Sequence, residues 1–168
     1  ISPYISGQRD GKADSWHIPV SLSLRPPSTV DRDLMRQTMK GYDSNNFYLF
    51  IAAVVGRGEA KRLMKLFNIG TSRHWPGSCV FWQTDVNGEI LTGKIMLYDW
   101  KTGHRVKKPF NHVSWVHSVM RFPDFNLRQC FFGEHQLRNR PDDAVAIVES
   151  EKSAVIAPHY MPQFVWLA

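Results

Sequence analysis

The 168-residue sequence has little cysteine and no long hydrophobic run. Its two cysteines, Cys79 and Cys130, stand far apart and form no Cys-x-x-Cys pair, which is typical of a reduced cytoplasmic protein. No apolar run approaches the ~20 residues that a membrane span needs, so we expect no membrane partner. The N-terminus has no signal-peptide pattern and no initiator Met, and we interpret the sequence as an internal part of a longer protein.

The sequence has a globular composition with an excess of positive charge. Apolar residues make up 43% and charged residues 21%, which indicates a packed core and argues against disorder. The net charge is +6. This balance favours an anionic partner such as nucleic acid, although scattered Lys and Arg residues more often form a solvated surface.

Helices are predicted in the first part of the chain. Turn residues interrupt the first 27 residues, where alternation over residues 20–24 predicts an arm that adds to a sheet edge. Ser28 or Thr29 is a candidate cap for a first helix, which Gly41 should end.

Two further apolar segments follow. Asp43 or Ser44 opens the segment 45–56, which is long enough for a buried helix, although its β-branched residues also allow a strand. Residues 58–70 form a clearer helix pattern, with apolar residues on one face, basic residues largely off it and Gly70 as the stop.

From residue 77 the hydrophobic period changes to two, which predicts an antiparallel meander. The predicted strands cover residues 78–84, 90–99 and 104–107. Asn87-Gly88 is a strong hairpin signal between the first two strands, and residues 101–103 form the next turn.

The C-terminal region combines mixed patterns with one clear βαβ signal. Residues 113–120 fit a short helix or strand, and 127–133 fit a strand followed by a turn. A strand over 144–148, a helix from about Ser150 and a strand over 164–167 predict a parallel pair. The whole pattern predicts an α+β fold with N-terminal helices, a central meander and a C-terminal βαβ unit.

Glu149 follows the strand 144–148 and is the first candidate for chemistry. A carboxylate at the C-terminal end of a parallel strand can bind a metal or act as a base. On the residues alone, the favoured interpretation is that Glu149 and Glu151 are acids that stabilise a helix N-terminus.

A resemblance adds weight to the catalytic interpretation. The stretch "VAIVESEKSAVIA" (145–157) resembles the first motif of Toprim domains, the catalytic fold of bacterial primases, topoisomerases and small nucleases. The resemblance implies that Glu149 is the catalytic glutamate, with Ser150 where glycine is usual. The fold expectation then becomes a C-terminal βαβ start of a Toprim-like α/β unit.

A longer resemblance covers nearly the whole chain. The pattern "FWQTD…GKIMLYD…TGHRVK…WVH…CFFGEH…VAIVESEK" resembles an uncharacterised domain family of Bacteroidetes mobile-element proteins, often found behind a zinc ribbon. Residues 66–107 are similar to the primase subdomain that precedes Toprim. The resemblance implies a basic pre-Toprim region over 1–140 and the first βαβ of a truncated Toprim-like domain over 141–168.

The carboxylates that complete a Toprim site are missing from the sequence. In a Toprim domain, a later strand ends in Asp-x-Asp, and these residues hold Mg²⁺ with the glutamate. The only such triplet is Asp31-Arg32-Asp33, upstream and at a predicted helix start. We therefore expect Mg²⁺ binding by Glu149 only in the full-length protein, and no cofactor in this fragment.

The truncated βαβ unit also suggests self-association. A lone parallel pair has exposed edges, which invite pairing with another chain. We expect the second strand, 164–167, to be covered by another copy or to be poorly ordered.

Basic residues around the meander are candidates for nucleic-acid or nucleotide contact. They are Arg73, His74, Lys94, Arg105, Lys107, Lys108 and Lys152. If they converge on one face, they can bind the phosphates of single-stranded DNA or another nucleic acid, with Trp75 or Trp82 for base stacking. The alternative is a solvated basic face.

Four residues offer metal ligands by type, although not by spacing. His112 and His117 with Cys130 and His135 match no standard zinc finger. Ordinary structural histidines are the favoured interpretation.

Three functions remain open at this point. The chain belongs to a primase-like Toprim protein of a mobile element that makes primers, it is a non-catalytic nucleic-acid-binding module, or it is a Toprim nuclease relative.

Overall fold

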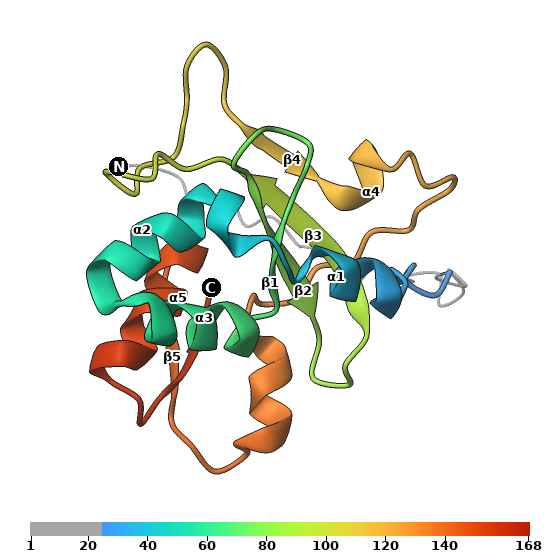
Figure 1. Cartoon of the computed structure of the whole chain (residues 1–168). Helices are drawn as coiled ribbons and strands as arrows, with labels where there is room; N and C mark the ends of the chain where they lie inside the picture. Colours follow the sequence, from blue (N-terminus) through green and yellow to red (C-terminus); the bar gives the residue numbers. More distant parts are fainter. Residues whose placement is uncertain (1–24) are drawn as a thin grey trace, which may run out of the picture.

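An antiparallel sheet of four strands lies at the centre of the fold (Figure 1). The computed structural model describes residues 25–168, and the arm predicted over 20–24 lies outside them. The strands follow the order β1-β2-β3-β4. Their bounds are Ile69–Thr71 (β1), Cys79–Thr84 (β2), Ile90–Met96 (β3) and Val113–Trp115 (β4).

Helices cover both faces of this sheet, and a second, parallel pair of strands has one of the helices between its two strands in the chain. The α-helices are Arg32–Thr38 (α1), Asn46–Val55 (α2), Arg57–Leu66 (α3), Val116–Val119 (α4) and Glu151–Tyr160 (α5). Two 3₁₀ helices span Tyr42–Ser44 (η1) and Glu134–Asn139 (η2). The parallel pair is Val145–Ile147 (β5) and Val165–Leu167 (β6).

Alternation along β2 divides the apolar side chains between two cores. Cys79 and Phe81 join the larger core, under α2, α3 and α5. Val80 and Trp82 point to the other face, where they pack with residues of α1 and α4. In Figure 1, α2, α3 and α5 lie on the left of the sheet and α1 and α4 on the right. The chain is α+β, as predicted.

The C-terminal βαβ unit shares the larger core. Val155 of α5 and Trp166 of β6 pack with residues of α2 and α3. The outer edge of β6 is covered, because Phe132 and Ala168 exchange backbone hydrogen bonds of 2.8 and 3.1 Å. The second strand, expected to be covered by another copy or to be poorly ordered, is instead covered by residues of the same chain, and self-association stays a prediction. The exposed apolar side chains of this pair lie on β5, at Val145 and Ile147.

The strongest local signals are confirmed. The hairpin between β2 and β3 turns at Gly88, whose φ is +88°, a conformation that favours glycine. β2 begins one residue after the predicted start, and the parallel pairing of β5 with β6 is as expected. Ser150 caps α5 by accepting a hydrogen bond from the backbone N–H of Ser153.

Three helix boundaries differ from the prediction. α1 is capped by Asp31, because the N–H of Val30 bonds to Ile90 of β3 and keeps the preceding residues extended. Asn45 caps α2 through the N–H of Tyr48. α3 ends at Leu66, and Gly70 lies inside β1.

Two predicted strands are absent. Residues 104–107 contribute only an isolated bridge between Tyr98 and Arg105, and β3 ends at Met96. The place beside β3 belongs to β4 at Val113–Trp115, directly followed by α4, so residues 113–120 hold both a strand and a helix. Residues 127–133 form loop and turn and contain no strand.

Candidate functional site

A groove with a cavity volume of about 1020 Å³ opens over the face of the sheet that carries α1 and α4. α1 forms one wall and α4 the other, and the loop between β1 and β2 (72–78) closes one end. Val80, Trp82 and Ile95 form an apolar floor. The groove is at the upper end of the size range of small-molecule sites in proteins.

Two glycines let the walls lie close to the floor. A Cβ atom on Gly70 would overlap the side chain of Thr38 in α1. A Cβ on Gly93 would lie 2.8 Å from Val116 Cγ2 in α4. Trp82 Nε1 donates a 3.0 Å hydrogen bond to Thr38 Oγ1, which fixes α1 against the floor. Both walls are thus held by packing against the rigid sheet.

The β1–β2 loop is fixed by hydrogen bonds to Ser78. Its hydroxyl donates to the carbonyl of Trp75 at 2.8 Å, and its carbonyl accepts from the N–H of Ser72 at 2.9 Å. Gly77, with a φ of +81°, accepts from the N–H of Asn46 at the start of α2. The loop therefore presents Trp75 to the groove in a fixed position.

Trp75 is also the centre of an aromatic cluster that continues outside the groove. Its ring centroid lies 4.3 Å from His74 and 5.1 Å from His112. Phe110 stacks on His112 at 4.2 Å, and its side chain is 52% exposed. We call His74, Trp75, Phe110 and His112 the aromatic cluster.

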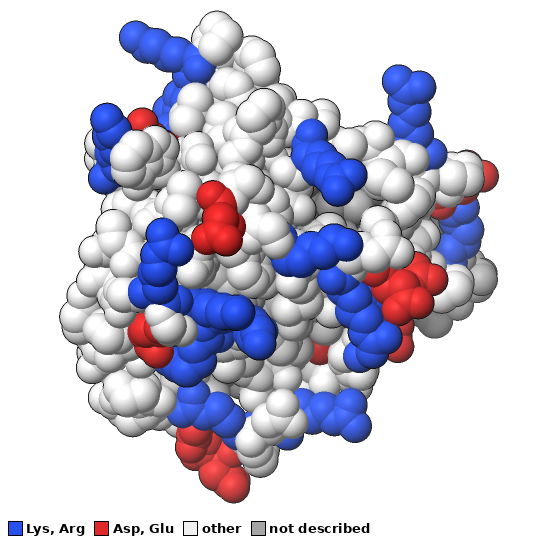
Figure 2. Space-filling model, in the orientation of Figure 1, with Lys and Arg blue, Asp and Glu red and all other residues white. Residues whose placement is uncertain are grey.

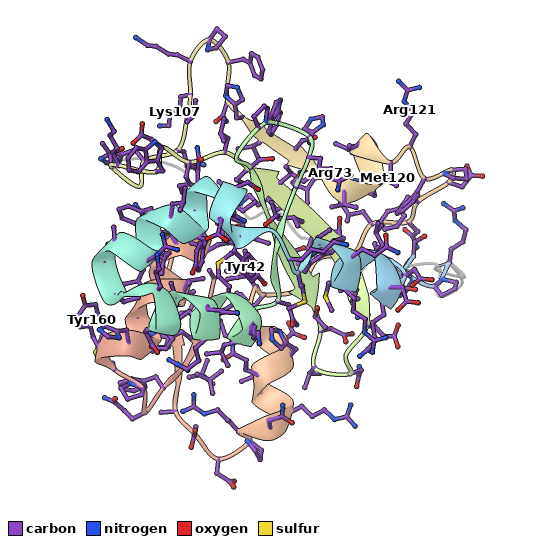
Figure 3. The ribbon with its side chains drawn as sticks, in the orientation of Figure 1. Tyr42, Arg73, Lys107, Met120, Arg121 and Tyr160 are labelled. Carbon is purple, nitrogen blue, oxygen red and sulfur yellow. The ribbon has the colours of Figure 1, made fainter. Side chains whose placement is uncertain are left out.

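Positive charge lies at the rim of the groove. Lys40 and Arg73 line it, and both are exposed. Among the described residues, neither has an ion-pair partner within 4.0 Å. Figure 2 shows Lys and Arg side chains spread across this view of the molecule, with Asp and Glu side chains among them. In Figure 3, Arg73 of the loop and Met120, directly after α4, lie near each other, and both line the groove.

Comparison of this chain with known protein families gives a match. A family model described as a domain of unknown function, DUF6371, matches residues 45–168. The chain belongs to the DUF6371 family. Neither a curated protein nor a solved structure matches it. The DUF6371 match includes the floor, the β1–β2 loop and α4, whereas α1 precedes it.

Of the basic residues predicted from the sequence, Arg73 and His74 lie at the groove. Arg105, Lys107 and Lys108 are exposed on the segment between β3 and β4. That segment also carries Phe110 and His112 of the aromatic cluster. Contacts between Trp75, Phe110 and His112 therefore link the basic residues at the groove to those on the segment between β3 and β4.

Lys94 and Lys152 have structural partners on the other face of the sheet. Lys94 Nζ lies 2.7 Å from Glu151 Oε1, and the two side chains are 25% and 13% exposed. Lys152 Nζ donates a 2.8 Å hydrogen bond to the carbonyl of Gly103 and lies over the ring of Phe50. Both lysines hold α5 against the preceding part of the chain.

Glu149 is exposed between β5 and α5. The neighbouring acid, Glu151, is committed to Lys94, so it supplies no second carboxylate for a metal. A lone exposed carboxylate is a poor Mg²⁺ site. The described residues hold no group of three or more His, Cys, Asp or Glu side chains placed to bind a metal ion.

The four soft ligands considered for zinc have other roles. His112 Nδ1 lies 3.2 Å from the carbonyl of Val106, and His117 Nδ1 lies 2.9 Å from Thr92 Oγ1. His135 Nε2 donates to the carbonyl of Leu66, and burial lowers the pKa of His135.

The two cysteines are both free. Burial raises the pKa of Cys130 to about 12 and that of Cys79 well above its usual range. Because the thiolate is the reactive form, neither is suited to act as a nucleophile at neutral pH.

The α1 and α4 walls of the groove were not predicted from the sequence. Lys40 and Gln37 of this region and Met120 after α4 line the groove. Their residue types carry no signal of binding. Gly93 inside the strand pattern is the one local hint, because glycine in a strand often marks the close approach of another segment. Within the described residues, no helix is both long and apolar enough to cross a bilayer.

Proposed function

We propose that this chain binds single-stranded nucleic acid along the groove and the adjoining aromatic cluster. The observation that carries the proposal is the groove itself, with an apolar floor, Trp75 held at one end and Lys40 and Arg73 at the rim. Proteins that bind single strands combine a positively charged groove with aromatic side chains on which bases stack. The net charge of +6 and the exposed Lys107 and Lys108 extend the positive region.

Salt dependence tests this proposal. A labelled strand of about 12 nucleotides, within the site sizes of single-strand binders, is titrated with protein while anisotropy is recorded. Affinity should fall as salt rises from about 50 to 200 mM, because bound phosphates release counterions. Lys40→Ala and Arg73→Ala should each make the negative slope of log K against log salt less steep by about 0.7.

Lys61→Ala is the matched control, because Lys61 is an exposed lysine of α3, on the other side of the sheet. Its slope should equal that of the wild type. If the wild-type protein binds no strand at low salt, or binds with no salt dependence, the proposed function is wrong.

A second candidate concerns a longer protein containing this chain, namely metal-dependent primer synthesis by a primase-like Toprim protein of a mobile element. Its support is the position of Glu149, which follows β5 of a parallel pair and precedes α5. Functional groups of α/β sheets gather at such strand ends. Mg²⁺ would then need further carboxylates from outside this chain. The two free cysteines fit a cytoplasmic protein.

Glu149→Gln in the longer protein tests this candidate. With Mg²⁺, single-stranded DNA and labelled nucleotides, the variant should lose primer extension and keep its affinity for the strand. Unchanged extension would exclude Glu149 as the catalytic residue, and strand cleavage in place of extension would favour a Toprim nuclease.

A further inference from the structure

We infer that the groove takes an unstacked base of the bound strand, and that the neighbouring base stacks on Phe110. This inference rests on the proposed function and specifies its ligand. It predicts that contacts with the bases, in addition to contacts with the phosphates, are a main source of the affinity for the strand. It also implies that Trp75 contacts both bases. The Trp75 ring lines the groove, and it also lies beside Phe110 and His112 of the aromatic cluster.

The chemistry of the groove suits a flat aromatic ring with polar edges. The floor of Val80, Trp82 and Ile95 is almost fully buried, so the apolar surface open to a ligand comes from the half-buried Leu34, Trp75 and Val119. At the α1 wall, the exposed Gln37 supplies an amide donor and acceptor, and it makes no side-chain hydrogen bond to the other described residues. Such an amide can pair with the edge of a base.

The charge at the rim suits the backbone that carries the base. Lys40 and Arg73 come from different elements and lie at the mouth of the same groove. A strand whose base enters the groove keeps its phosphates at this rim, where the two cations contact them. The apolar lining of the groove and its charged rim therefore match the two parts of one nucleotide.

The aromatic cluster provides the place for the next base. Phe110 is 52% exposed and stacks on His112, which lies 5.1 Å from Trp75. Lys107 and Lys108 precede Phe110 on the same exposed segment. Aromatic rings alternating with cations favour a nucleic-acid strand over an acidic peptide, because every base has a flat face for stacking.

A strand without bases separates base contact from phosphate contact. Two strands of about 12 nucleotides are compared, one normal and one abasic at every position, with equal phosphate charge. The wild-type protein should bind the normal strand at least tenfold more tightly, because stacking contributes substantially for each base. Trp75→Ala should weaken binding of the normal strand about tenfold and leave binding of the abasic strand unchanged.

A far-UV circular-dichroism spectrum equal to that of the wild type checks that the Trp75→Ala variant is folded. Trp100→Ala is the matched control, because Trp100 is 50% exposed on the turn after β3, next to Lys101 and outside the aromatic cluster. Its preference for the normal strand should equal that of the wild type. Phe110→Ala should reduce the preference by a smaller factor than Trp75→Ala.

The outcomes distinguish this inference from the proposed function. Equal, salt-dependent binding of both strands by the wild-type protein would overturn the base-binding inference and leave nucleic-acid binding in place. Absence of binding to both strands would overturn both. Polyglutamate of matched charge is the competitor, and if it displaces the normal strand as well as unlabelled strand does, charge alone explains the binding and the inference fails.

Discussion

Lys94 is the residue whose position most changes its interpretation. Its charge and its place in the meander predicted contact with a nucleic acid or nucleotide, and its ammonium group lies against Glu151 in a partly buried pair. Removing one member of such a pair leaves the other charge without a partner in a poorly solvated place. The contact that the structure gives Lys94 holds α5 on the sheet.

We predict that Lys94→Met lowers the free energy of unfolding by about 2 kcal/mol, between the effects known for exposed and fully buried pairs. Urea denaturation measures the change. Strand affinity of the folded variant should be unaffected. Lys61→Met, at an exposed position of α3, should change stability by less than about 0.5 kcal/mol. A stable Lys94→Met variant with weakened strand binding would restore the original interpretation.

Local sequence patterns predicted the positions of some site residues but not of others. Arg73, His74 and Trp75 follow a predicted helix and precede a predicted strand, so their loop was expected from the sequence. The contact between Trp75 and His112 joins residues 37 positions apart, and no local pattern encodes that contact. The partners of Lys94 and Lys152 likewise depend on how α5 packs.

At the scale of elements, the groove depends on how closely α4 approaches the sheet. Gly93 of β3 permits this approach, because a Cβ there would meet side chains of Val116, Val80 and Trp82 at 2.8–2.9 Å. Adding atoms to a filled core forces neighbouring groups to shift.

We therefore predict that Gly93→Ala lowers the free energy of unfolding by about 1–3 kcal/mol and weakens strand binding. Urea denaturation and anisotropy measure the two effects. Gly58→Ala is the control, since Gly58 lies in α3 with no atom within 4 Å of an added Cβ. That change should stabilise the protein by about 0.5–1 kcal/mol, because alanine favours helix. A Gly93→Ala variant as stable as the wild type would show that the α4 wall is not packed as described.

Elements with short-range signals were the ones predicted correctly. The β2–β3 hairpin was predicted because its turn residues and its alternation lie within one short stretch. The strand expected over 104–107 was wrong because this segment follows Gly103, which packs on Phe50 of α2, and it makes only one bridge to the sheet. β4 pairs with β3 in place of the predicted strand, and this pairing depends on how β4 fits beside β3.

At the scale of the whole molecule, one core spans elements far apart in the chain. Phe47 and Phe67, from the first half of the chain, share a core with Val155 and Trp166 near the C-terminus. Residues 141–168 therefore contribute apolar surface on which the preceding elements depend.

We predict that α5 and β2 unfold in one cooperative transition. Native-state hydrogen exchange should give the Val155 and Phe81 amides opening free energies within about 1 kcal/mol of each other. Independent unfolding of the C-terminal unit would appear as an opening free energy for α5 that is lower by several kcal/mol.

The sequence by itself determined the α+β class, the hairpin at Asn87-Gly88, the βαβ order at the C-terminus and the loop that carries Trp75. Each of these follows from hydrophobic period, turn residues or caps that act over a few positions. Only the tertiary structure decided which cations remain at the surface, which acid pairs with Lys94, and that α1, α4 and the β1–β2 loop enclose one groove. The physical reason is that burial and close packing depend on contacts between residues distant in the chain, and those contacts form only when all the elements assemble.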